Sequence, residues 1–200
     1  MTQTLTGLFD RYDDARRAVQ DLEAAGVAHR DISIVANDAS GAHRDQLDPA
    51  AQDAGTGAGI GAAVGGLSGL LAGLGLIAIP GVGPVVAAGW LVATAAGVAG
   101  GAVIGAAAGG LVGALTHAGV PEQDAHVYAE GVRRGGTLVT AKVDEPLVPT
   151  ARAILGDDRT VNLGERRRTY EAEGWNHFDD NAPNYTEAEI EAERLRFERP

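Results

Sequence analysis

The residues with the clearest potential for chemistry are the glycines of GTGAGIGAAVGG, residues 55–66. Gly57, Gly59 and Ala62 match the string G-x-G-x-x-A, which cradles a dinucleotide pyrophosphate where a strand joins a helix. The preceding residues DPAAQDA do not read as a strand, and the acidic residue needed for the ribose is missing until Glu122. A P-loop would need Lys and then Ser or Thr after the last glycine, and neither is present. The stretch therefore does not predict a nucleotide site, and no cofactor is expected.

Other reactive side chains also lack the spacing that chemistry needs. Ser68 misses the nucleophile elbow because position 70 is Leu rather than Gly. The acid pairs 13–14 and 157–158 are adjacent in sequence and read as solvated surface. The arginines 166–168 could contact anionic lipid headgroups, but the glutamates around them weaken the positive potential that such contact needs. No H-x-x-x-H pair occurs among the histidines, which are His29, His43, His117, His126 and His177. We therefore predict no catalytic residue and no metal site, and expect that the chain is not an enzyme.

Charge is distributed very unevenly along the 200 residues. The formal net charge of -11 opposes nucleic-acid binding, because phosphate contacts need a basic surface. No cysteine is present, so disulfides and thiolate metal sites are excluded. Between Ala54 and Pro121, 68 residues contain no Asp, Glu, Lys or Arg, and 20 of the 29 glycines lie there. Any domain organisation proposed for the chain has to account for this uncharged run.

Within the uncharged run, glycine recurs at every fourth position in two series. Because an α-helix has about 3.6 residues per turn, residues spaced by four stay close to one stripe of its surface. A glycine stripe lets two helix backbones approach closely, as small-xxx-small pairs do in lipid. We therefore predict helix-packing positions at Gly57, Gly61, Gly65, Gly69, Gly73, Gly97, Gly101, Gly105, Gly109 and Gly113.

The two series flank IPGVGP, residues 79–84, which reads as a helix breaker. The prediction is an antiparallel helical hairpin over residues 54–120 in which glycine faces glycine. Residues 57–79 and 85–115 exceed the roughly 20 residues of a membrane span, although their alanine and glycine content makes insertion marginal. The alternatives are burial by self-association and an unstructured Gly/Ala linker, which the interleaved Ile and Leu residues oppose. Contacts with lipid or a second chain are assigned to Leu70, Leu71, Leu74, Ile77 and Ile79.

The segments on both sides of the run read as two halves of one α+β domain. In residues 1–53, the strand patterns TLTGLF and ISIVA enclose an amphipathic helix. In residues 121–163, a helix leads through Gly135-Gly136 into the strand TLVTAKVD, a short helix over 147–155 and a last strand over 159–163. The prediction is a ferredoxin-like β-α-β…α-β-α-β layer with the Gly/Ala-rich hairpin inserted. Residues 164–200 form a polar tail, with a Thr186–Glu189 capping box before a charged helix.

Three stretches together resemble a known bacterial family. They are TLTGLFDRYDDARRAVQDLEAAGV followed by DISIVAND, a glycine-rich core with IPGVGPVVAAG, and EGVRRGGTLVTAKVD. Over residues 3–163 they resemble the general stress protein 17M / YflT-like family of heat-induced stress proteins. The closing EGW…FDDNAPNYTEAEIEAER is similar to tails of the longer members. The resemblance implies a role in bacterial stress response, and it brings neither a catalytic signature nor functional residues.

The sequence therefore predicts a non-enzymatic stress-response protein whose glycine hairpin mediates membrane association or self-assembly. Its expected partners are further copies of itself and membrane lipid, with no nucleic acid. Because no secretory signal opens the chain, we expect a cytoplasmic or inner-membrane location with both lobes cytoplasmic. One alternative is a small-ligand sensor, in which the α+β domain binds an effector and moves the hairpin. The other, and the weakest, is a nucleotide-binding enzyme.

Overall fold

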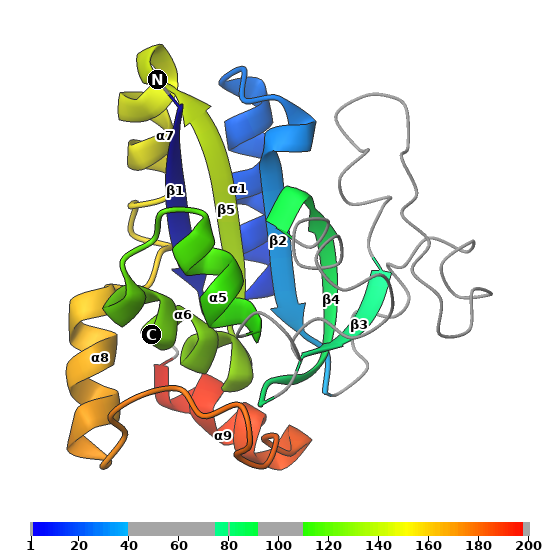
Figure 1. Cartoon of the computed structure of the whole chain (residues 1–200), viewed down its shortest axis with the longest axis vertical. Helices are drawn as coiled ribbons and strands as arrows, with labels where there is room; N and C mark the ends of the chain where they lie inside the picture. Colours follow the sequence, from blue (N-terminus) through cyan, green and yellow to red (C-terminus); the bar gives the residue numbers. More distant parts are fainter. Residues whose placement is uncertain (1, 40–74, 80, 92–109, 198–200) are drawn as a thin grey trace.

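A five-stranded antiparallel sheet forms the centre of the molecule (Figure 1). The computed structural model describes residues 2–39, 75–79, 81–91 and 110–197. The strands lie in the order β1-β5-β2-β4-β3. Their bounds are Thr2–Phe9 for β1, Ile32–Asn37 for β2, Gly75–Ile79 for β3, Gly83–Gly89 for β4 and Thr137–Asp144 for β5. Because β1 and β2 both pair with β5, the last strand in sequence lies between the first two.

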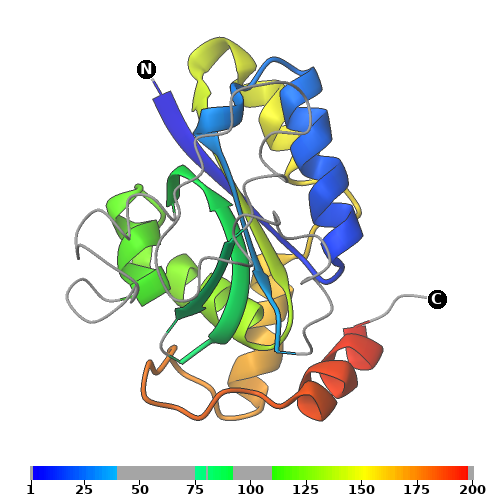
Figure 2. The same cartoon turned by 90° about the vertical axis from the view of Figure 1, so that its right-hand side faces the viewer.

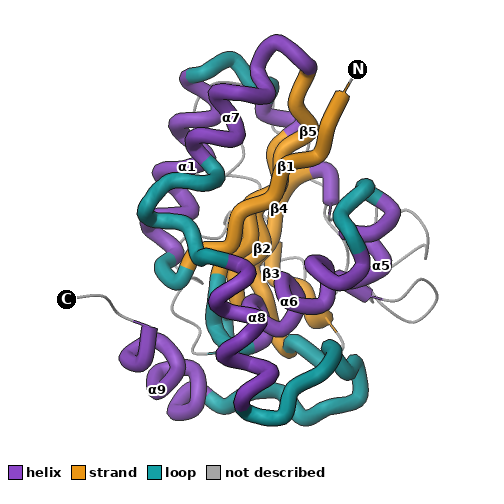
Figure 3. The backbone as a smooth tube through the Cα atoms, turned by 90° about the vertical axis from the view of Figure 1, so that its left-hand side faces the viewer, coloured by secondary structure: helices purple, strands orange, loops and turns teal. Residues whose placement is uncertain are grey.

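Helices cover both faces of this sheet (Figure 2). On one face lie α1 (Tyr12–Ala24) and α7 (Val148–Ile154), and on the other lie α5 (Gly110–His117) and α6 (Glu122–Arg133). α8 (Leu163–Ala172) packs beside α6, and α9 (Glu187–Phe197) lies at the lower end of the molecule in Figure 1. Two short 3-10 helices, η1 (His29–Asp31) and η3 (Glu145–Leu147), precede β2 and α7. Seen from the side of β1, the two helical layers lie on either side of the strands (Figure 3).

Two hydrophobic cores result, one on each face of the sheet. In β2, Ile32 and Ile34 belong to the core under α1 and α7, whereas Val35 belongs to the core under α5 and α6. This alternation follows from the two-residue repeat of a strand, which sends successive side chains to opposite faces. All of β2 is buried, as expected for a strand with helices on both sides.

Several predictions made from the sequence are confirmed. The α+β class holds, and β5 covers the stretch TLVTAKVD that was expected to be a strand. Gly26 ends α1 with a left-handed φ of 97°. The capping box is present, since Thr186 N donates to Glu189 Oε2 at 2.8 Å and Glu189 N donates to Thr186 Oγ1 at 3.4 Å.

The centre of the uncharged run is a β-hairpin with strands at Gly75–Ile79 and Gly83–Gly89, so the helical prediction is wrong for residues 75–79 and 85–89. β3 pairs with β4, β4 pairs with β2, and the sheet thereby gains two strands that a ferredoxin-like layer of four does not have. Short apolar runs do not separate helix from strand by periodicity, and here GLIAI and PVVAA flank a glycine turn. Gly81 and Gly83 have φ values of 72° and 95°. Ile79, assigned to lipid or a partner, is 3% exposed within the chain's own core.

Two further predictions concern the second half of the chain. The last strand predicted over 159–163 is wrong: it is reduced to one bridge between Thr160 and Phe9, and α8 begins at Leu163. The polar tail contains α8, which the sequence did not predict, as well as the expected α9.

Most of the predicted glycine positions lie outside the described residues. Gly113 is described and lies half-buried in α5. No helix in the described part of the chain is long and apolar enough to span a membrane. The positions outside it are Gly57, Gly61, Gly65, Gly69, Gly73, Gly97, Gly101, Gly105 and Gly109, together with Leu70, Leu71 and Leu74.

Candidate functional site

Buried charges gather at the C-terminal end of α6, in the motif EGVRRGG, residues 130–136. Glu130 is 1% exposed and accepts hydrogen bonds from Arg134 Nε at 2.7 Å and Arg133 Nη1 at 3.2 Å. The three- and four-residue spacings of a helix bring these side chains to one another. A carboxylate this deeply buried is stable only when paired, and the two guanidinium groups provide the pairing.

The glycines of the motif are required by close packing. A Cβ added to Gly131 would lie 2.4 Å from Leu8 Cδ2, so α6 lies directly on β1 at that point. Gly135 ends the helical segment with φ 101°, a conformation that side chains other than glycine rarely adopt. The motif thus combines a close helix–sheet contact, a buried ion pair and a sharp turn into β5.

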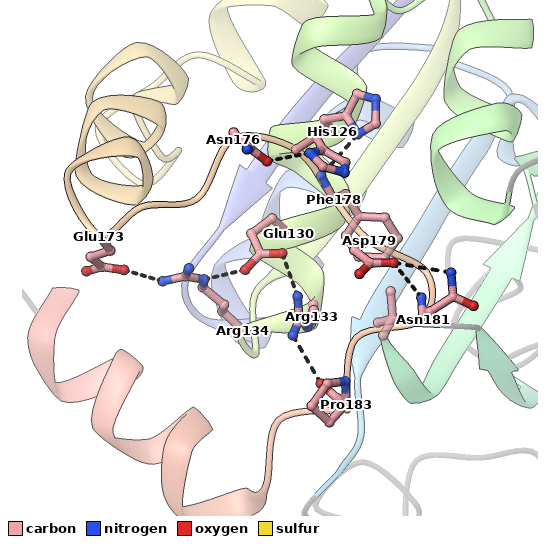
Figure 4. A network of polar contacts seen from close by, with 12 residues as sticks. His126, Glu130, Arg133, Arg134, Glu173, Asn176, Phe178, Asp179, Asn181 and Pro183 are labelled. Carbon is pink, nitrogen blue, oxygen red and sulfur yellow. Dashed lines mark hydrogen bonds and ion pairs between the residues drawn. The ribbon is translucent and has the colours of Figure 1, made fainter.

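Residues 175–197, which we call the strap, cross this end of α6 (Figure 4). Arg134 lies between Glu130 and Glu173, and its Nη1 donates to Glu173 Oε2 at 2.7 Å. The same Nη1 lies 3.5 Å from Glu193 Oε1 of the strap. The guanidinium carbon of Arg134 lies 4.0 Å from the centre of the Tyr170 ring, in a cation–π contact.

The strap also covers the turn between β3 and β4. A Cβ on Gly81 would lie 2.8 Å from Asp179 O, and a Cβ on Gly83 would lie 3.2 Å from the Asn184 side chain. Phe178 is buried, and its N–H donates to His126 Nδ1 at 3.2 Å. The strap therefore contacts α6 and the centre of the uncharged run at the same time.

Burial and pairing act in opposite directions on the ionisable groups of this network. Burial by itself lowers the pKa of Arg134 and raises the pKa of Glu173, whereas the hydrogen bond between them acts against burial in both. With Glu130 and Arg196 adding to it, pairing prevails: the pKa of Arg134 is raised and that of Glu173 lowered. Permanently charged guanidinium–carboxylate pairs bind and orient; they do not supply an acid or base at neutral pH. Within the chain, the guanidinium groups of this site hold carboxylates in place.

A second feature is a cleft of about 860 Å³ beside β1. Arg166 is 8% exposed and donates to both carboxylate oxygens of Asp10 at 2.8 Å, while the Phe197 ring lies 3.6 Å from its guanidinium carbon. Tyr128 donates to Thr6 O at 3.1 Å, and burial, with a contribution from Asp124, raises the pKa of Tyr128 to about 12. The polar residues that line the cleft include Thr6, Asp10, Tyr128, Thr160, Asn162 and Arg166.

The structure places the residues considered from sequence as follows. Asp13 and Asp14 pair with Arg16 and Arg17 along α1, in agreement with solvated surface. His126 and His177 lie with ring centres 6.3 Å apart, and the described residues contain no group of His, Cys, Asp or Glu side chains arranged to hold a metal. Arg166, one of three arginines considered for headgroup contact, instead pairs with Asp10.

Sequence reasoning missed the EGVRRGG network itself. Its signal was available: opposite charges at spacings of three and four on one helix, immediately before a Gly-Gly turn. The partners Glu173 and Glu193 lie 39 and 59 residues away from Arg134, and no local pattern connects them.

Residues 4–77 match the family model of the heat induced stress protein YflT domain. The family resemblance found in the sequence is thereby confirmed over those residues, which are fewer than half of the chain. They include most of β1, all of α1 and β2, and most of β3, whereas EGVRRGG and the strap lie beyond them. Neither the comparison with curated proteins nor that with solved structures found a significant match.

Proposed function

We propose that the chain is a non-enzymatic stress-response protein that works by association, its glycine-rich segments binding further copies of the chain or inserting into a membrane. The match to a heat induced stress protein domain supports the stress-response part. The observation that carries the association part is the four-residue glycine register within an uncharged run of an otherwise acidic chain. Helix stripes of this kind pack against one another, and unpaired they would leave an extended apolar surface.

The β3–β4 hairpin gives the two glycine-rich segments a shared attachment. Gly75 pairs with Ala87, and Leu91 follows shortly after β4, so the described residues that border the two segments lie at the same end of the hairpin. Two segments attached side by side are suited to an antiparallel contact between them. The proposal therefore keeps glycine facing glycine, with a β-hairpin in place of the helix breaker first expected at residues 79–84.

Replacing Gly65 and Gly105 together by Leu tests this proposal. Leucine side chains in a close glycine contact overpack it, so we expect the double variant to lose self-association and membrane retention. The measurements are sedimentation of the purified chain and retention of the native protein in membranes washed with alkaline carbonate. The matched control is Gly65→Ala with Gly105→Ala, which keeps both positions small and should retain association. A leucine variant that associates like the alanine variant would contradict the proposal.

The cleft beside β1 favours a second candidate, a small-ligand sensor. Polar groups from β1, α6 and α8 converge there, and Thr6 Oγ1 is buried without a hydrogen-bond partner in the described structure. A ligand that binds the folded chain raises its melting temperature by mass action. Stabilisation by small polar compounds, lost in Thr6→Val, would support the sensor, whereas stabilisation by ATP or NAD(P) would support the nucleotide-binding alternative.

A further inference from the structure

We infer that the arginine end of α6 is a binding site for an acidic peptide segment with aromatic and aliphatic anchors. The strap is its intramolecular ligand, and the strap of a second copy is the partner that fits the same site. By the arginine end we mean Arg133, Arg134 and Gly135, together with the adjoining β3–β4 turn. The inference names a partner for the self-association proposed above, and rests on that proposal only in requiring that copies meet.

Side chains of the strap meet this surface with charge and apolar groups in matching places. Glu193 pairs with Arg134, and the Tyr185 ring centre lies 5.1 Å from the guanidinium carbon of Arg133. Ile190 is 3% exposed and packs so closely on Gly135 that a Cβ there would lie 2.4 Å from Ile190 Cγ2. The surface thus contacts an acidic group, an aromatic ring and an aliphatic side chain of the strap at the same time, a combination typical of sites that bind amphipathic segments.

The backbone of the strap is also held by hydrogen bonds with α6. His126 Nδ1 accepts from Phe178 N, and Arg133 Nη2 donates to Pro183 O at 3.1 Å. Backbone contacts of this kind fix the path of a bound segment, whereas the side-chain contacts fix its sequence. Both kinds are present over the described part of the strap.

Three features make the strap separable from the chain that carries it. Gly174, immediately before it, has φ 88°, and a Cβ there would meet nothing within 4 Å. Of residues 175–197, only Phe178 and Ile190 are buried. Trp175 Nε1, Glu193 Oε2 and Arg133 Nε are buried with no hydrogen-bond partner in the described structure, which costs free energy in the docked state. A segment held in this way opens before the core does.

Opening at Gly174 would leave α8 in place. Arg166 pairs with Asp10, and Arg167 Nη2 lies 2.6 Å from Asp124 Oδ1, so α8 is held independently of the strap. Opening would expose the arginine end, whose shape and charge fit the strap itself best. Exchange of an identical element between copies creates a dimer without any new kind of contact.

A labelled peptide of residues 175–197 tests the binding site on the full chain. Ile190→Ala weakens docking of the chain's own strap, so we expect this variant to bind the peptide at least ten-fold more tightly than the wild type does. The control Leu195→Ala changes a residue of α9 that is 62% exposed, and should bind like the wild type. A peptide that itself carries Ile190→Ala should fail to bind. If the Ile190→Ala chain does not fold, Glu193→Gln takes its place.

Deleting Asn176 and His177 tests exchange between copies. Both residues are exposed, and their loss shortens the connection after Gly174, so that a strap reaches a neighbour more readily than its own chain. Made in the Gly65→Leu/Gly105→Leu background, the deletion should double the mass measured by light scattering, and adding Ile190→Ala should reverse that. No peptide binding by a folded variant, or no change in mass after the deletion, would overturn the inference. The background variant alone reports on the glycine segments, so the two proposals fail separately.

Discussion

Arg134 occupies an unusual position for a charged side chain, because it is 8% exposed and contacts carboxylates from three separate places in the chain. Its partner Glu130 is more deeply buried still. The pair matters less for the attraction that it contributes than for the charge that would remain if one member were removed.

Arg134→Ala should lower the free energy of unfolding by about 3–5 kcal/mol, because the buried carboxylate of Glu130 would lose its closest partner. Urea unfolding followed by circular dichroism measures the change. Arg152→Ala, at an exposed position of α7, is the control and should stay within about 0.5 kcal/mol of the wild type. Replacing Glu130 and Arg134 together by Leu and Met should cost less than Arg134→Ala. A loss below about 1 kcal/mol for Arg134→Ala would show that Arg133 alone suffices for Glu130.

Among the elements, the β3–β4 hairpin differs most from the structure expected from sequence. Gly89 at the end of β4 has φ 97°, and a Cβ there would lie 2.2 Å from Ile32 O. In a helix, alanine in place of glycine stabilises by roughly 1 kcal/mol, whereas at this strand end it clashes with the neighbouring backbone. Gly89→Ala would therefore raise the stability of a helix at this position but lower the stability of the hairpin.

Gly89→Ala should destabilise the protein by about 1–3 kcal/mol, the cost of a left-handed residue with a side chain and a local clash. Gly164→Ala is a control of opposite sign: it lies in α8, and its added Cβ makes an ordinary 3.5 Å contact with Asn162 Oδ1. That variant should be unchanged or more stable by up to about 1 kcal/mol. Thermal melts of the three proteins decide the matter, and a stabilising Gly89→Ala would favour the helix.

Elements with a strong local pattern were predictable, and elements fixed by distant partners were not. The alternation in TLVTAKVD predicts β5, and the glycine after α1 and the capping box before α9 mark their helix ends. The stretch 75–89 lies between two series of glycines spaced by four, which predicted helix, but itself contains short β-branched runs, and the pairing of β4 with β2 decides for the strand. α8 has little amphipathic character; it is held by Tyr170 and by ion pairs with residues far away in sequence.

At the scale of the whole molecule, the strap joins the second half of the chain to the centre of the uncharged run. Glu173, just before the strap, pairs with Arg134 and with Arg196 of the strap, and these ionic contacts are present where its carboxyl is charged. Because the folded-state pKa of Glu173 is lowered, these contacts stabilise the protein above the ordinary glutamate pKa of about 4.3, and the stabilisation is lost as pH falls through the lowered value.

Glu173→Gln should therefore be less stable than the wild type at pH 6, and the difference should shrink as the pH is lowered towards 3. Unfolding free energies of both proteins, measured across this range, give the comparison. Glu171→Gln is the matched control, because Glu171 is exposed and makes no ion pair within the described structure. A difference between wild type and Glu173→Gln that stays constant down to pH 3 would contradict the role assigned to the carboxylate.

The position of β5 between β1 and β2 has a consequence for how the protein is made. Thr2 is paired with Asp144, so the place between β1 and β2 is filled by a strand that leaves the ribosome long after both of its neighbours. The residues that match the stress-protein family model contain most of β1 and all of β2 but not the strand that joins them. Contacts between parts so distant in sequence form slowly. During synthesis, β1 and β2 therefore cannot be joined in the sheet until β5, which ends at residue 144, has been made.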